Sequence, residues 1–106
     1  MHERGRPRIE VNYPVTLSSE GGNGTGTMTN LTITGGEIES DLTTKIGAHF
    51  RVHIQLSGAR SPIDIAIVMV RWQRDHRFGV EFVRFEDNAK AQLQQMLNQS
   101  DVNPAS

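Results

Sequence analysis

The chain has 106 residues, of which 11 are Lys or Arg and 12 are Asp or Glu, so its formal net charge is −1. This length suits one globular domain with a single core, and a content of 36% hydrophobic residues excludes a disordered or fibrous chain. The absence of cysteine excludes disulfides, thiolate nucleophiles and zinc–thiolate sites.

The first part of the chain alternates between apolar and polar residues, which is typical of a half-buried strand. Apolar side chains occupy the odd positions of residues 9–17. Pro14 falls on the polar phase and cannot donate to a neighbouring strand, so we expect an edge strand or a bulge there. Residues 18–26 contain four glycines and predict a loop, after which residues 27–31 predict a second strand.

Four further strands are predicted after a tight turn at residues 34–36. Residues 37–39, 48–56 and 78–82 each alternate between apolar and polar side chains. Residues 63–72 are apolar on both phases in the middle of the segment, as expected for a strand that is central in a barrel or covered by a helix.

Near the C-terminus the apolar spacing changes to that of a helix over residues 87–99, with one apolar stripe. This stripe consists of Ala89, Leu93, Met96 and Leu97. Asp87 is the predicted N-cap, and the polar residues 100–106 predict a frayed tail. Six antiparallel strands followed by one helix predict a mainly β fold, in which the strands close into a barrel and the helix covers one opening.

The sequence shows no pattern typical of an enzyme or a metal site. His49 and His53 are four residues apart, but on a strand this spacing separates them by about 13 Å, too far to share an ion. No serine occupies a nucleophile-elbow pattern. Glu37, Glu39 and Asp41 fall on one phase of a short strand, where a solvent-exposed acidic face is expected. We therefore expect no enzymatic activity, no metal and no cofactor.

Two short motifs carry residue types that suit a phosphorylated ligand. Residues 4–8 read Arg-Gly-Arg-Pro-Arg, an Arg-x-x-x-Arg frame whose guanidinium forks match phosphates and the O6 and N7 edge of guanine. Residues 30–36 read Asn-Leu-Thr-Ile-Thr-Gly-Gly, in which an amide and a hydroxyl precede two glycines at a strand end. Taken alone, the first motif is commonly a solvated tail and the second a plain turn.

Together and in this order, the two motifs resemble the ligand-binding signature of the PilZ family, Arg-x-x-x-Arg followed by Asp/Asn-x-Ser-x-x-Gly. The resemblance extends over nearly the whole chain, because residues 8–15, 70–72 and 78–82 are similar to strands of that family and a closing helix follows. It implies a six-stranded antiparallel PilZ-type β-barrel with a C-terminal α-helix. One position departs from the pattern, since Thr32 stands where the family usually has serine.

The resemblance implies binding of the bacterial second messenger cyclic di-GMP. It implies a flexible arm at residues 1–8 that folds over the ligand, a barrel and helix at residues 9–99, and a tail at residues 100–106. The expected binding residues are Arg4, Arg8, Asn30, Thr32 and Gly35, with Arg6 and Gly36 in support.

Elementary chemistry suits these positions. Asn30 offers both a donor and an acceptor to a guanine edge or a ribose, and Thr32 adds a hydroxyl. Gly35 is expected to allow a positive φ in the turn and a close approach of backbone to the bases. Trp72 has the flat surface needed to stack on a base, but a lone Trp in a strand is more often part of the core.

The expected function is that of a receptor in which ligand orders the arm. The changed surface would pass the signal to an unidentified partner protein acting in trans. The alternative is an interaction module of the same fold that does not depend on the nucleotide, although both arginines of the frame are present. A third class, a barrel for single-stranded nucleic acid, needs several exposed aromatics, whereas the aromatics here fall mostly on core phases.

We expect no contact with DNA, RNA or a membrane. A net charge near zero gives no general electrostatic attraction to phosphates. The longest apolar run, residues 65–70, is far short of the about 20 residues that cross a bilayer. No apolar segment follows the N-terminal arginines as in a secretory signal, so a cytoplasmic location is expected.

Overall fold

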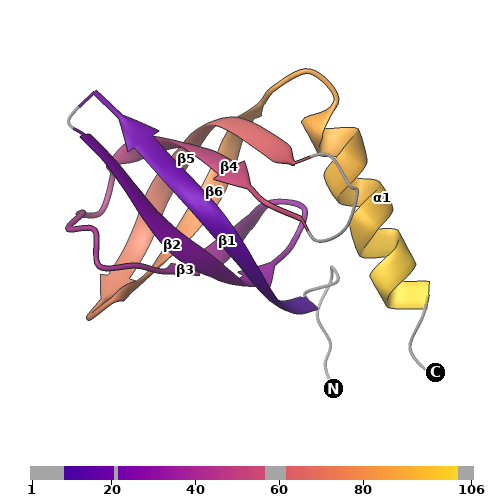
Figure 1. The fold of residues 1–106 in the computed structure, drawn as a ribbon, viewed down its shortest axis with the longest axis horizontal. Coiled ribbons are helices and arrows are strands. Elements are labelled where there is room, and N and C mark those ends of the chain that lie inside the picture. Colours follow the sequence, from indigo (N-terminus) through magenta and orange to yellow (C-terminus); the bar gives the residue numbers. More distant parts are fainter. Residues whose placement is uncertain (1–8, 21, 57–61, 103–106) are drawn as a thin grey trace.

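The fold is a closed barrel of six antiparallel strands with one helix, shown in Figure 1 as a computed structural model that describes residues 9–20, 22–56 and 62–102. The elements are β1 (Ile9–Ser19), β2 (Gly22–Leu31), β3 (Gly35–Glu39), β4 (His49–Ile54), β5 (Ile63–Arg74), β6 (Arg77–Phe85) and α1 (Ala89–Val102). Around the barrel the order is β1-β2-β3-β6-β5-β4, and β4 closes the circle by pairing with β1. The predicted barrel with a C-terminal helix is confirmed. The predicted arm, residues 1–8, lies outside the described residues.

The core fills the inside of the barrel with the apolar phase of each strand. Leu17 of β1, Val52 of β4 and Val68 of β5 are fully buried. Phe50 and Phe78 stack across the interior with ring centroids 6.4 Å apart. Burial of each such side chain contributes roughly 1.5–3 kcal/mol to the stability of the fold. The apolar residues whose alternation predicts the strands therefore also favour closure of the barrel.

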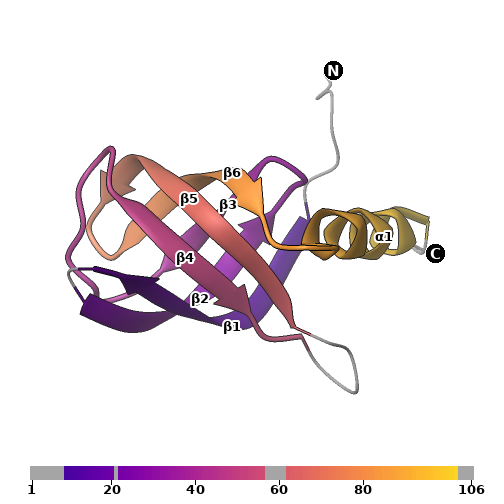
Figure 2. The same cartoon turned by 90° about the horizontal axis from the view of Figure 1, so that it is seen from above.

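Helix α1 lies at the end of the barrel where β6 ends (Figures 1 and 2). Its apolar stripe is buried, since Leu93 and Leu97 expose at most 2% of their surface. Tyr13 of β1 directs its hydroxyl at Met96 Sδ over 3.9 Å. The helix also contacts β5. In β5 the buried positions change from odd (Ile63, Ile65) to even (Val68) where the register against β6 shifts, so apolar residues occur on both phases.

The ends of α1 differ from those predicted. Asn88 rather than Asp87 is the N-cap, because the Asn88 carbonyl accepts the first helical hydrogen bond, from the Gln92 N–H at 2.9 Å. Asp87 adopts a positive φ of 36° just before the helix. The helix continues to Val102, past the predicted end at residue 99, and residues 103–106 of the predicted tail lie outside the described residues.

The glycine-rich segment predicted as a loop is instead the β1–β2 hairpin. β1 runs to Ser19, which pairs with Gly22 at the start of β2. At Gly26 a Cβ would lie 2.6 Å from the Glu39 carbonyl oxygen and 2.9 Å from Ser40 Cβ, so glycine allows β2 to lie close to the end of β3. Glycine disfavours strands when its segment is considered alone. Here the pairing of β2 with its neighbouring strands outweighs this preference.

Of the two alternatives predicted at Pro14, the structure has a bulge and not an edge strand, because β1 pairs with both β2 and β4. The register of β1 against β2 shifts between Glu10 and Tyr13, which places a bulge just before the proline. The Pro14 carbonyl accepts a hydrogen bond of 2.9 Å from the Gln55 N–H, beyond the end of β4.

Candidate functional site

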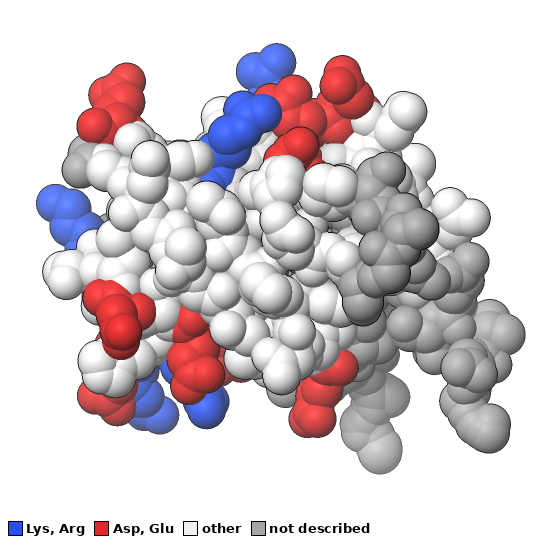
Figure 3. All heavy atoms as spheres, viewed as in Figure 1, with Lys and Arg blue, Asp and Glu red and all other residues white. Residues whose placement is uncertain are grey.

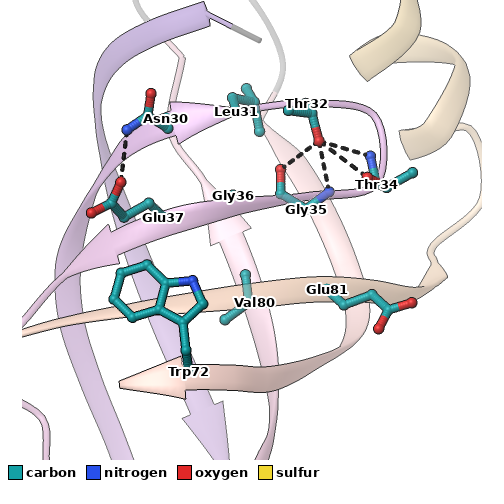
Figure 4. A pocket seen from close by; sticks show the side chains of 10 residues that line it. All are labelled: Asn30, Leu31, Thr32, Thr34, Gly35, Gly36, Glu37, Trp72, Val80 and Glu81. Atoms are coloured by element: carbon teal, nitrogen blue, oxygen red, sulfur yellow. Dashed lines mark hydrogen bonds between the residues drawn. The ribbon is translucent and has the colours of Figure 1, made fainter. Parts of the chain in front are cut away.

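A pocket of about 480 Å³ lies where the β2–β3 turn faces β6 and the last part of β5 (Figure 4). This volume is within the range of about 300–1,000 Å³ typical of small-molecule sites. The lining residues are Asn30, Leu31, Thr32, Thr34, Gly35, Gly36, Glu37, Trp72, Val80 and Glu81. The structure thus brings together four positions predicted from the sequence. They are Asn30, Thr32, Gly35 and Gly36.

The register of the four strands places residues in one row across the outer wall of the barrel. Asn30 of β2 pairs with Glu37 of β3. Glu37 in turn pairs with Gly79 of β6, which pairs with Trp72 of β5. Neighbouring strands are about 4.8 Å apart, so the row spans about 14 Å. Ile38, the next residue along β3, is in the core, which directs Glu37 outward.

The hydroxyl of Thr32 holds the β2–β3 turn together. Its Oγ1 accepts hydrogen bonds of 3.1 Å from the backbone N–H groups of Thr34 and Gly35. The hydroxyl donates to the Gly35 carbonyl at 3.2 Å and forms a further hydrogen bond of 3.2 Å with Thr34 Oγ1, in which either oxygen can be the donor. The Thr32 N–H also donates to the Gly35 carbonyl at 2.8 Å. The requirement for a hydroxyl in the motif therefore has a structural explanation, because both lone pairs and the hydrogen are engaged within the turn.

The glycines of the turn are required by close approach rather than by backbone conformation. The expectation of a positive φ at Gly35 was wrong, because the glycines with positive φ in the described part of the chain are Gly22 and Gly47. A Cβ at Gly35 would overlap the Val80 carbonyl oxygen of β6. At Gly36 a Cβ would lie 2.6 Å from the Asn30 carbonyl oxygen. Both positions let β3 lie against its neighbours where any side chain would clash.

Glu37 belongs to the pocket, although the sequence indicated an acidic face open to solvent. Only 20% of its side chain is exposed. Its Oε1 accepts a hydrogen bond of 2.8 Å from Asn30 Nδ2, and its Oε2 lies 3.4 Å from Arg77 Nη1. The turn motif could have located Glu37 from the sequence. Thr32 and Gly35 lie opposite each other at the turn, so the residues two positions before and after them, Asn30 and Glu37, are expected to pair.

Trp72 is the second residue of the pocket that the sequence assigned elsewhere. The interpretation as a core residue was wrong, because Trp72 is 42% exposed. Trp72 is two residues after the buried Val70, so in a regular strand both side chains would point into the core. The register of β5 against β6 shifts between these two residues. Such a bulge inserts one residue and turns the next side chain to the other face. The indole then lies over Gly79, where a Cβ would overlap its nitrogen.

Polar side chains outside the pocket form small groups in the part of the chain that the structure describes. Within residues 9–20, 22–56 and 62–102, no group of three or more His, Cys, Asp or Glu side chains is placed to hold a metal ion. His53 Nδ1 and Asp64 Oδ1 form a pair at 2.6 Å between β4 and β5, away from the pocket. Figure 3 shows the face formed by β1 and β2 with its charged side chains around the margin and a largely uncharged centre.

Comparison with family models matches residues 2–99 of the chain to the PilZ domain. The chain belongs to the PilZ family. No curated protein sequence matches this PilZ domain. In its described part, no helix combines the length and the apolar character needed to cross a membrane.

Three solved structures share the fold of this PilZ domain. The Bacillus subtilis inhibitor of motility, MotI/DgrA, matches all of this chain with a TM-score of 0.81 at 16% identity, and the match spans 55% of the MotI/DgrA chain. The PilZ domain of YcgR from Escherichia coli, with c-di-GMP, matches at a TM-score of 0.73 and 12% identity over 95% of this chain and 93% of its own. The PilZ domain of CeSA from a cellulose-synthesizing bacterium matches at 0.64 and 12% identity, over 89% and 97%.

The predicted arginines of this PilZ domain, Arg4, Arg6 and Arg8, lie outside the described residues. The strand that follows them is described, and its register shows where β1 begins in the barrel. Ile9 pairs with Leu31, the residue between the two polar positions of the motif. The described part of β1 therefore begins beside a residue that lines the pocket.

Proposed function

We propose that this PilZ domain binds cyclic di-GMP in the pocket between the β2–β3 turn and Trp72. The observation that carries the proposal is the gathering of the turn motif and an exposed indole in one pocket, next to the point where the arginine segment joins β1. PilZ domains typically bind cyclic di-GMP, and the YcgR domain of the same fold is described with this ligand.

The chemistry of the ligand fits the residue types available. Cyclic di-GMP carries two phosphates and two guanines, and an arginine fork matches either a phosphate or the O6 and N7 edge of guanine. Arg4 and Arg8 are four residues apart, so in an extended segment they reach about 13 Å and can engage opposite sides of the ligand. The exposed Trp72 offers a flat face on which a guanine stacks.

Isothermal titration with cyclic di-GMP tests the proposal. Wild-type protein is expected to bind saturably, and an Arg4→Ala/Arg8→Ala variant is expected to lose most of the affinity. The matched control is Arg51→Ala/Arg84→Ala, which removes the same charge from exposed positions that do not line the pocket. No binding by wild type, or equal loss in both variants, contradicts the proposal.

The signal is passed on, in this proposal, through the arm. Ligand contacts from the arginines order residues 1–8 and change the surface around this arm and the barrel mouth, which a partner protein in trans then recognises. The protein acts as a receptor in the cytoplasm and not as an enzyme. Hydrogen exchange of residues 1–8 with and without cyclic di-GMP measures this step, and equal exchange in both states contradicts it.

A second candidate is an interaction module that works without nucleotide. The likeness to MotI/DgrA, described as an inhibitor of motility, favours a role in contacting other proteins. A pull-down distinguishes the two functions. Capture of the same partner with and without cyclic di-GMP, and equally by wild type and Arg4→Ala, supports the interaction module. Capture that requires cyclic di-GMP and is lost in Arg4→Ala supports the receptor.

A further inference from the structure

The row of residues across the outer wall presents three chemically different groups in register. An amide (Asn30), a carboxylate (Glu37) and an indole (Trp72) lie on neighbouring strands, and Gly79 lies between the last two. Because the indole lies over Gly79, its ring extends toward the column that holds Glu37. Figure 4 shows the carboxylate and the ring on the same side of the strands.

The Glu37 carboxylate is held in one place. Its Oε1 accepts from Asn30 at 2.8 Å, and Arg77 Nη1 lies 3.4 Å from its Oε2. Glu37 exposes 20% of its side chain, so it is largely shielded from solvent, yet it lines the pocket. A carboxylate provides about four lone-pair sites, so these contacts leave acceptor sites for a ligand.

We propose that Glu37 reads the Watson–Crick edge of a guanine stacked on Trp72 and thereby selects guanine over other purines. This inference rests on the proposed binding of cyclic di-GMP. Guanine presents its N1–H and its 2-amino group as adjacent donors, which match the two oxygens of one carboxylate. Adenine places an acceptor at N1 and lacks the 2-amino group, so it would set a lone pair against the carboxylate.

The charges around Glu37 make this role compatible with an anionic ligand. Arg77 also lies 3.7 Å from the Glu39 carboxylate, so one guanidinium serves two acids on β3. It places positive charge next to Glu37 and reduces repulsion of the phosphates. When a bound base offers no hydrogen-bond donor to a shielded carboxylate, the carboxylate oxygens lose contact with water and gain no partner. Such a site therefore binds analogues that lack the donor more weakly.

Glu37→Gln tests the inference, because glutamine keeps an oxygen to accept from Asn30 but replaces the other oxygen with a donor that opposes guanine. The matched control is Glu39→Gln, which removes the same charge on the same strand beside the same Arg77 but does not line the pocket. Each protein is titrated with cyclic di-GMP, cyclic di-AMP and cyclic di-IMP, whose hypoxanthine bases lack only the 2-amino groups.

We expect Glu37→Gln to weaken cyclic di-GMP binding by roughly 10- to 100-fold, and Glu39→Gln by less than about threefold. Wild type should bind cyclic di-GMP at least about tenfold more tightly than cyclic di-IMP. This difference should largely disappear in Glu37→Gln, a result that a purely structural role of the carboxylate would not produce.

Two failures remain distinguishable. If wild type binds none of the three dinucleotides, the proposed function fails, and this inference fails with it. If wild type binds cyclic di-GMP but does not discriminate against cyclic di-IMP, or if Glu37→Gln keeps the full discrimination, the guanine-reading role is overturned while the receptor stands. If Glu37→Gln does not fold, equal binding of cyclic di-GMP and cyclic di-IMP by wild type still overturns the role.

Discussion

Replacing Thr32 with valine removes the hydroxyl of the β2–β3 turn while keeping nearly the same shape. Two backbone N–H groups, of Thr34 and Gly35, lose their acceptor, and each bond is 3.1 Å long. The Thr34 N–H is exposed and turns to water, whereas the Gly35 N–H is partly buried and stays poorly solvated. With a net value of about 0.5–1.5 kcal/mol for an ordinary hydrogen bond, we expect a loss of about 1–2 kcal/mol in the free energy of unfolding.

Thermal or urea unfolding measures this loss, and 1 kcal/mol corresponds to a shift of roughly 4–8 °C for a domain of this size. Thr32→Ser keeps the hydroxyl and should stay close to wild type. Thr16→Val, at an exposed position of β1, controls for the intrinsic effect of valine in a strand. A Thr32→Val protein as stable as the Thr16→Val protein would refute the structural role assigned to this hydroxyl.

Three further predictions follow from the same structure. Gly35→Ala should cost about 1–3 kcal/mol by forcing β3 away from β6, whereas Gly24→Ala, whose nearest neighbour is the flexible side chain of a leucine, should cost less; equal unfolding midpoints would contradict this. Trp72→Ala should weaken cyclic di-GMP binding by roughly tenfold in a titration and Trp72→Phe much less, because stacking needs an aromatic face. Arg51→Ala breaks an exposed ion pair of 2.9 Å with Glu86, so it should lower stability by less than about 1 kcal/mol in urea unfolding.

The sequence was sufficient for the barrel because alternation is a local signal. Apolar side chains two residues apart predict one buried face wherever they occur, and closure then follows from the number of strands. The β1–β2 hairpin shows the limit of local reasoning. Its glycines indicate a loop when taken alone, and only the three-dimensional structure shows that Gly26 lies too close to the end of β3 for a side chain.

The pocket was predicted in part for the same reason. Asn30, Thr32 and Gly35 are close in sequence, so one turn gathers them. Trp72 was assigned to the core because its phase reverses at a bulge, and a bulge depends on how β5 pairs with β6. Glu37 was assigned to a solvent-exposed face because its partial burial arises from the neighbouring strands of the wall and not from its own segment.

The lining of the pocket and the filling of the barrel use opposite faces of the same strands. On β3 the outward Glu37 reaches the pocket while the next residue, Ile38, is fully buried. Substitution of an outward side chain such as Glu37 or Trp72 therefore leaves the hydrophobic interior intact. A domain built in this way is able to change what it recognises one residue at a time, without first becoming more stable to tolerate the change.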